Sequence, residues 1–155
     1  MSERTAEGIV AADSLARFGS YVVEDQVGFL MRKAQQRHTA LFLERMAVCD
    51  LTATQFTALI KIVEMGQVTQ NLLGRLAAMD PATIQGVVRR LVARGLASRA
   101  RDPMDRRTVV LAATPAGRAL AVQAVAVAHE VTAATLAPLD EVDQMRFLAL
   151  LRRLG

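Results

Sequence analysis

Apolar residues recur at intervals of three and four along most of this 155-residue chain, which places them on one face of successive helices. Two short segments, LASRA at 96–100 and TVVLA at 108–112, have the composition of strands instead. The loop between these segments is rich in arginine and aspartate. The apolar pattern predicts helices over residues 24–47, 52–66, 69–78, 81–94, 115–137 and 140–153.

Capping signals agree with these helix boundaries. Thr52 is followed three residues later by Gln55, the spacing of a capping box. Asp80 is a good N-cap, and Pro81 suits the first helical position because its missing N–H is not needed there. Gly95 is positioned to end the same helix.

The segment 115–137 is ambiguous, because AVQAVAVA alternates as a strand would. Its length without turn signals and its high alanine content favour a helix. Thr114 is then the N-cap, and Pro115 occupies the first turn.

From residue 52 the predicted order is helix, short helix, helix and two-stranded hairpin. Two short helices joined by a tight turn form a helix-turn-helix, whose second helix can enter a DNA major groove. A hairpin that follows it is a wing. We therefore predict a mainly α protein with a small β-hairpin wing, in which a winged helix-turn-helix is combined with further helices.

The positive charge of the chain is concentrated in its centre. The formal net charge is +4, yet residues 75–107 alone hold eight arginines and three aspartates. Such a distribution is expected of a protein that binds a polyanion such as DNA. A basic surface kept only for solubility is the alternative at this point.

The helix over 81–94 carries side chains suited to reading a major groove. Gln85 can pair with adenine through two hydrogen bonds, and Thr83 can offer a hydroxyl or contact a thymine methyl group. Arginines further along the helix can meet phosphates, and the helix starts at Thr69 and Asp80 present backbone N–H groups. The candidate DNA-binding residues are Thr69, Gln70, Pro81, Ala82, Thr83, Gln85, Arg89, Arg90 and Arg94 in the helices, with Asp105, Arg106 and Arg107 in the wing.

The loop RDPMDRR suits the narrow, electronegative minor groove. Asp105 is close enough in sequence to hold Arg107 or a neighbouring arginine in an extended pose, which lowers the entropy lost on binding. The alternative is that these charges only keep a hairpin soluble.

The sequence from residue 25 to the end resembles the MarR family of bacterial regulators, through LTATQF, DPATIQGVVRRLVARGL and RDPMDRRTVVLAATPAG. The resemblance implies a homodimer that binds a pseudo-palindromic operator in double-stranded DNA and most often represses transcription. It also implies three parts, which are an N-terminal dimerisation part over 1–50, a DNA-binding lobe over 51–114 and C-terminal dimerisation helices over 115–155.

In much of that family a small aromatic acid binds between the dimerisation helices and the DNA-binding lobe. On the first long helix His38 lies in the apolar stripe, with Phe42 one turn later and Arg45 nearby. An imidazole or guanidinium beside an aromatic wall suits a planar carboxylate, and Arg17 and Tyr21 are expected neighbours. The alternative is a core histidine bound to a backbone carbonyl.

Three other functions are disfavoured. An oxidation sensor through Cys49 needs an exposed thiol of low pKa, and Asp50 beside it would raise that pKa. A protein-binding adaptor fits poorly with a helix over 81–94 that has three arginines and no acid after its cap. For an enzyme the chain lacks phosphate-binding and metal-binding motifs, so we expect no catalytic residue, metal or cofactor.

The N-terminal MSERTAEG is polar and lacks the apolar core of a signal peptide. No uninterrupted apolar run reaches the roughly 18 residues of a membrane-spanning helix. We therefore expect a cytoplasmic protein without membrane association.

Overall fold

The computed structural model describes residues 19–102 and 108–154. The chain divides into two compact units, residues 1–37 and 38–155, and each is considered by itself. The described part of the first unit contains the 3-10 helix η1 (Val23–Asp25) and the beginning of helix α2 (Val27–Met46). The second unit continues with η2 (Ala47–Cys49), α3 (Ala53–Met65), β1 (Val68–Thr69), α4 (Gln70–Leu76), α5 (Pro81–Ala93), β2 (Ala97–Arg101), β3 (Val109–Ala113), α6 (Pro115–Leu136) and α7 (Glu141–Leu154).

The predicted helix boundaries are confirmed to within a few residues. Thr52 and Gln55 form a complete capping box at the start of α3. Asp80 caps α5, Pro81 occupies its first turn, and Gly95 follows its end with a φ of 69°. The ambiguous segment is helical, since α6 runs from Pro115 to Leu136.

The sheet has one strand more than the predicted hairpin. Strands β2 and β3 pair antiparallel, with Arg99 opposite Leu111, and they form the predicted wing. The extra strand β1 pairs with the other edge of β3, with Val68 opposite Leu111. This short strand joins the start of α4 to the wing, so the helix-turn-helix and the wing are parts of one lobe.

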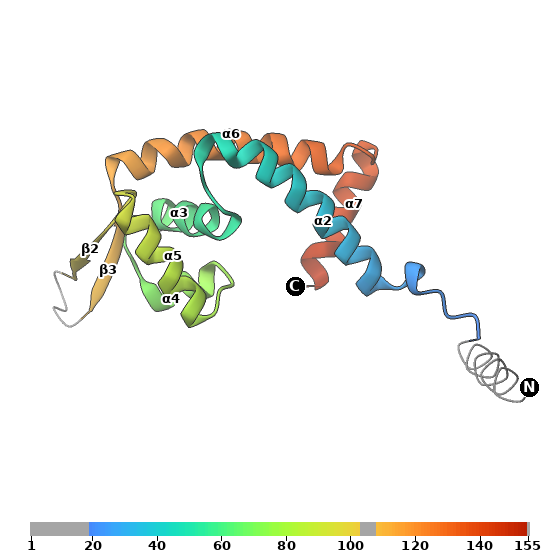
Figure 1. The fold of residues 1–155 in the computed structure, drawn as a ribbon, viewed down its shortest axis with the longest axis horizontal. Helices are drawn as coiled ribbons and strands as arrows, with labels where there is room; N and C mark the ends of the chain where they lie inside the picture. The colour runs from blue at the N-terminus through green and yellow to red at the C-terminus, as the bar shows by residue number, and fades with distance from the viewer. Residues whose placement is uncertain (1–18, 103–107, 155) are drawn as a thin grey trace, which may run out of the picture. The chain divides into compact units, whose positions relative to one another are not determined.

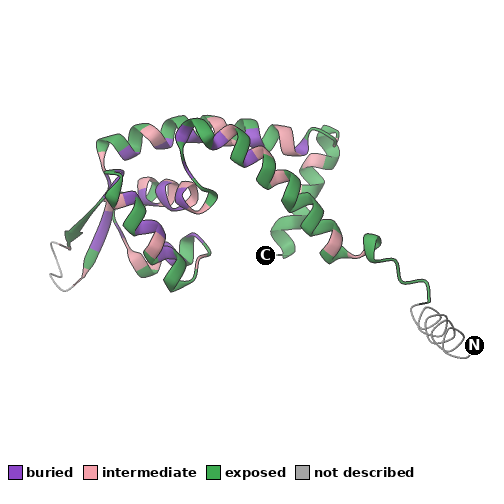
Figure 2. Ribbon diagram, in the orientation of Figure 1, coloured by how far each residue is buried: buried purple, intermediate pink, exposed green. Residues whose placement is uncertain are grey.

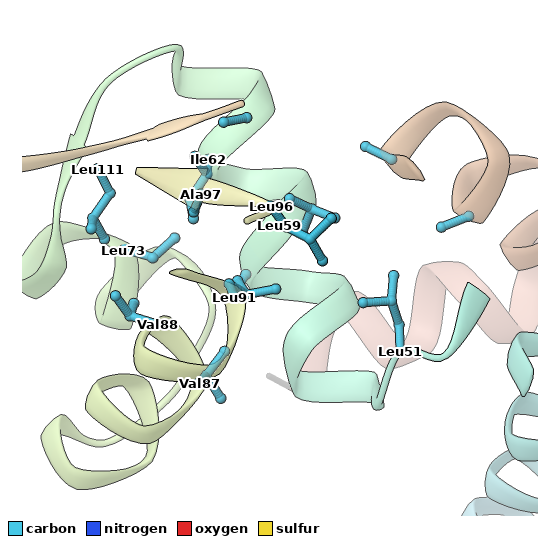
Figure 3. Close-up of a cluster of buried hydrophobic side chains, with 14 of the residues drawn as sticks. Leu51, Leu59, Ile62, Leu73, Val87, Val88, Leu91, Leu96, Ala97 and Leu111 are labelled. Carbon is cyan, nitrogen blue, oxygen red and sulfur yellow. The ribbon is translucent and has the colours of Figure 1, made fainter. Parts of the chain in front are cut away.

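The core of the second unit lies where α3, α4, α5 and the sheet meet. Figure 3 shows Leu59 of α3, Leu73 of α4 and Leu91 of α5 among the converging side chains, and all three are fully buried. Helix α3 contacts α4 and α5 on one side and α6 on another (Figure 1). The core thereby fixes the orientation of α5 within the lobe.

Helices α6 and α7 leave much apolar surface uncovered. No residue of α7 is buried, and the helix is drawn almost entirely as exposed or intermediate (Figure 2). By length and mean hydropathy alone α6 is able to span a membrane, although its sequence contains no uninterrupted apolar run of that length. Its alanines and valines raise the mean hydropathy, although Ala121, Ala124 and Val131 among them belong to the buried core.

Candidate DNA-binding surface and ligand site

Helix α5 presents one apolar and one polar face, and we call it the recognition helix. Ile84, Val87, Val88 and Leu91 are buried in the lobe. Gln85 lies on the outer side and is exposed. Because the apolar residues hold the helix against α3 and α4, this polar face is presented in a fixed orientation.

Asp80 holds the first turn of the recognition helix. Its carboxylate accepts hydrogen bonds from the backbone N–H groups of Ala82 and Thr83, at 3.0 and 2.9 Å, and from the Thr83 hydroxyl. The side-chain hydrogen bond from Thr83, helped by these N–H groups, lowers the pKa of Asp80 below its usual value. The Thr83 hydroxyl, predicted to read a base, therefore already donates its proton to the cap.

A cavity of about 290 Å³ joins the recognition helix to the wing. It is lined by Ala82, Gln85, Gly86 and Arg89 from α5 and by Arg99 from β2. Arg99 was not among the residues predicted from the sequence. Arginines stand at alternate positions of β2, 99 and 101, and this pattern could have indicated a basic face of the hairpin. Which face turns toward α5 is set by strand pairing rather than by local sequence.

Arg90 and Arg94 lie on the other flank of the recognition helix. Arg90 is exposed, as expected for a phosphate contact. Arg94 instead forms an ion pair with Asp50, with its guanidinium 3.3 Å from the carboxylate, and it also donates to the Asp50 carbonyl oxygen. This pairing ties the end of α5 to the turn after α2, so Arg94 is less available to DNA than the sequence suggested.

The remaining predicted DNA contacts have different surroundings. Thr69 caps α4 by accepting from the Leu72 N–H, and Gln70 begins that helix partly buried. Pro81 and Ala82 are exposed at the start of α5. The wing residues Asp105, Arg106 and Arg107 lie outside the described residues.

His38 forms a specific polar contact rather than the backbone hydrogen bond proposed as its alternative. Its Nδ1 lies 3.0 Å from the Thr135 hydroxyl of α6. That hydroxyl donates its only proton to the Val131 carbonyl oxygen at 2.8 Å, so it accepts from His38. Nδ1 therefore carries the hydrogen of this bond.

Phe42 and Arg45 continue the same side of α2. Phe42 is buried, with its ring centroid 6.5 Å from that of His38. Arg45 approaches Glu130 of α6, with 3.7 Å between guanidinium and carboxylate. His38 and Arg45 thus contact α6, whereas the Phe42 ring lies 6.0 Å from that of Phe56 in α3.

The other two predicted ligand residues precede the second unit in the sequence. Tyr21 belongs to the first unit and is 61% exposed. Arg17 lies outside the described residues.

Cys49 is buried at the end of η2, and this burial raises the pKa of its thiol. An oxidation-sensing cysteine needs the opposite, an accessible sulfur of low pKa. The structure therefore weakens the redox alternative further, through burial rather than through the charge of Asp50.

Comparison with known proteins extends these observations. Residues 51–109, which include the helix-turn-helix, match the model of the MarR family. The chain is also 36% identical over 154 residues to the HTH-type transcriptional repressor NicR of Pseudomonas putida, and the match covers 99% of this chain and 95% of that protein. The chain belongs to the MarR family.

As a MarR-family protein it is a transcriptional regulator with a winged helix-turn-helix, as predicted. A probable transcriptional regulator from Pseudomonas aeruginosa is 46% identical, with a TM-score of 0.82 over 86% of this chain and 100% of that one. BpsR of Bordetella bronchiseptica is 38% identical, with a TM-score of 0.83 over 88% of this chain and 97% of that one. The BpsR structure concerns regulation of its DNA binding by 6-hydroxynicotinic acid.

Proposed function

We propose that this MarR-family regulator is a cytoplasmic, homodimeric repressor that leaves its operator when a small aromatic carboxylate binds. The observation that carries the DNA-binding part is the shared cavity of the recognition helix and the wing, which Gln85 and Arg89 of α5 line together with Arg99 of β2. A neutral amide that lines the same cavity as two guanidinium groups suits a base edge flanked by phosphates.

In this proposal the recognition helix enters the major groove. Gln85 contacts a base, while Arg89, Arg90 and Arg99 neutralise phosphates. Thr69, Gln70, Pro81, Ala82 and Thr83 lie at the helix starts, close to the phosphates in this proposal. The N–H groups of Ala82 and Thr83 already donate to Asp80, so with Pro81 they approach the DNA backbone through van der Waals contact. Arg106 and Arg107 reach the minor groove, with Asp105 beside them, and Arg94 contributes only after it leaves Asp50.

The uncovered apolar residues of the terminal helices support a dimer. Met145, Phe147 and Leu151 of α7 are exposed, as are Val122 and Val125 of α6. A second copy of the chain would cover such a surface through a two-fold axis. We propose that residues 1–50 and 115–155 form this interface and that 51–114 form the DNA-binding lobe, so the operator repeats its half-sites about one turn, ~34 Å, apart.

For the effector we propose a pyridine or benzene carboxylate that binds beside α2. The support is the likeness to BpsR, whose DNA binding responds to 6-hydroxynicotinic acid, together with the groups along α2. The Nε2 of His38 has no hydrogen-bond partner within residues 19–102 and 108–154 and can meet a hydroxyl or a carboxyl group. Arg45, which approaches Glu130 at 3.7 Å, supplies a positive charge one turn from Phe42. Arg17 and Tyr21 remain predicted neighbours of this ligand.

A salt-dependent fluorescence-anisotropy titration tests the proposal. The full-length protein is titrated onto DNA from its own upstream region, with random duplex as competitor, and then with 6-hydroxynicotinate, nicotinate or benzoate. We expect palindrome-dependent binding that weakens steeply with salt and is reversed by one of the acids. Equal affinity for random DNA contradicts the proposed sequence-specific binding to an operator and favours a protein-binding adaptor. Specific binding that no acid reverses contradicts only the proposed aromatic carboxylate effector.

A further inference from the structure

Gly86 lies in the middle of the recognition helix, where the packing of the lobe gives no reason for a glycine. Glycine weakens a helix interior relative to alanine, because it loses more conformational freedom on folding. It is therefore expected inside a helix where the missing side chain makes room for something else. Among the described residues, no atom beyond the chain neighbours and the helix's own backbone lies within 4 Å of a Cβ added at Gly86.

The other two helical glycines in the described part of the second unit differ from Gly86. In α4 a Cβ on Gly74 would lie 3.2 Å from the carbonyl oxygen of Met79, and in α6 a Cβ on Gly117 would lie 1.9 Å from that of Leu96. These two glycines allow close packing within the chain. The space at Gly86 is not used in this way, so a partner molecule is the candidate that fills it.

This space belongs to the cavity of about 290 Å³ that the recognition helix shares with the wing. The helix residues that line it, at positions 82, 85, 86 and 89, have the spacing of a single helix face. Ala82 and Gly86 lie one turn apart and supply only a methyl group and a backbone CH₂ group. The cavity therefore has a small apolar part beside its polar side chains.

The polar side chains of the cavity are open to a partner. Gln85, Arg89 and Arg99 are exposed, and none of them has a hydrogen-bond or ion-pair partner within residues 19–102 and 108–154. No carboxylate of those residues lines the cavity. The three side chains can therefore donate to acceptor atoms of a base edge or of phosphates.

The small apolar part matches one group of the DNA major groove. The C5-methyl group of thymine is the apolar group that base pairs present there. It needs a space that any side chain at position 86 would fill, whereas cytosine carries only a hydrogen on the same carbon. The shape of the cavity can thus distinguish thymine from cytosine without a hydrogen bond.

We propose that Gly86 determines specificity for a thymine, whose methyl group enters the cavity against Gly86 and Ala82. The thymine lies next to the base that Gln85 contacts, while Arg89 and Arg99 hold the phosphates at the edge of the cavity. This contact rests on the DNA binding proposed above. It adds a base position that is read through van der Waals contact alone.

The test removes only the methyl group from the DNA. Full-length protein is titrated by fluorescence anisotropy onto its footprinted upstream site, in which each thymidine is replaced in turn by 2′-deoxyuridine, with random duplex as competitor. Deoxyuridine keeps all the hydrogen-bonding groups of thymidine. At one position of a half-site we expect wild-type binding to weaken about fourfold, the effect of one buried methyl-sized group.

Gly86→Ala should reverse this preference, because its methyl group occupies the space of the thymine methyl. We expect the variant to bind the thymidine site about tenfold more weakly than wild type and to bind the deoxyuridine site better than the thymidine site. A circular dichroism melt verifies that it folds. Arg90→Ala is the control, because Arg90 is exposed on the other flank and is assigned to a phosphate, so both sites should weaken by the same factor.

Three results would count against the thymine contact, and they are distinguishable. Equal binding to the upstream site and to random duplex would contradict the proposed function and this contact together. Specific binding that no deoxyuridine replacement weakens would overturn the thymine contact alone. A Gly86→Ala variant that keeps the wild-type preference for thymidine at the sensitive position would also overturn it, since the methyl group would then be read elsewhere.

Discussion

The hydroxyl of Thr114 donates a hydrogen bond to the carbonyl oxygen of Gly95 at 2.6 Å, which ties the start of α6 to the end of the recognition helix. The Thr114 N–H donates to the carbonyl oxygen of Leu96 at 3.1 Å. Gly117 packs directly on that carbonyl group, since an added Cβ would lie 1.9 Å from the Leu96 oxygen. The start of α6 is thus held against the residues that follow α5 by one side-chain and one backbone hydrogen bond and by the close approach of Gly117.

Replacement of Gly117 by alanine should therefore destabilise the lobe strongly. The methyl group would overlap a backbone oxygen that cannot rotate away, so we expect a loss of about 3 kcal/mol in the free energy of unfolding. Gly86→Ala is the matched control, because nothing lies within 4 Å of a Cβ there and alanine favours the helix. Urea denaturation followed by circular dichroism measures both, and equal stability of the two variants would disprove the close contact.

The cap at Asp80 predicts a dependence of stability on pH. The pKa of Asp80 is lower in the folded chain than its usual value of 3.8, so its ionised form stabilises the fold. This contribution is complete above pH 3.8 and is lost as the pH falls below it through the folded pKa.

The measurement compares wild type with Asp80→Asn, which still offers an oxygen to the helix N–H groups but does not titrate. Urea midpoints between pH 7 and pH 3 should show a wild-type advantage that shrinks below pH 3.8. An advantage that stays constant over this range would mean that the charge of Asp80 contributes nothing.

Features encoded by neighbouring residues could be predicted from the sequence, and the capped helices are the clearest case. The Asp80 cap and the box of Thr52 with Gln55 act over two or three residues, so they mark helix starts directly. Helix α2 begins at Val27 instead of at residue 24, because Val23–Asp25 form a separate 3-10 turn.

Contacts between distant residues could not be predicted in this way. Strand β1 consists of only Val68 and Thr69, and its partners on β3 lie about forty residues later. The hydrogen bond of His38 to Thr135 spans 97 positions, and the contact of Arg94 with Asp50 spans 44. Each depends on how the helices pack, for which no short motif is a signal.

Because Gln85 is exposed on the recognition helix, we expect its substitution to change the base preference of DNA binding without changing the salt dependence of binding. Gln85→Ala should cost about 1–3 kcal/mol on the operator and relax the preference at one position of each half-site. Arg89→Ala should weaken binding to every sequence and flatten the salt slope by about one unit. Anisotropy titrations on a panel of single-base operator variants compare the two. A uniform loss for Gln85→Ala would exclude a base contact.

The hydrogen bond of His38 with Thr135 predicts an effect on the effector alone. Valine at position 135 removes the acceptor that orients the imidazole, so Nε2 loses its defined direction and the proposed effector binds more weakly. We expect Thr135→Val to require several-fold more effector to release the operator, a loss of about 1 kcal/mol, while DNA affinity without effector is unchanged.

Thr132→Val is the control for this substitution, because Thr132 lies on the same helix, is exposed and shows no contact with His38. It should leave effector response and DNA affinity as in wild type. His38→Gln, which keeps a hydrogen-bonding group without the ring, should reproduce the weaker response of Thr135→Val, because both changes act on the same imidazole. An unaltered effector response in both Thr135→Val and His38→Gln would remove His38 from the ligand site.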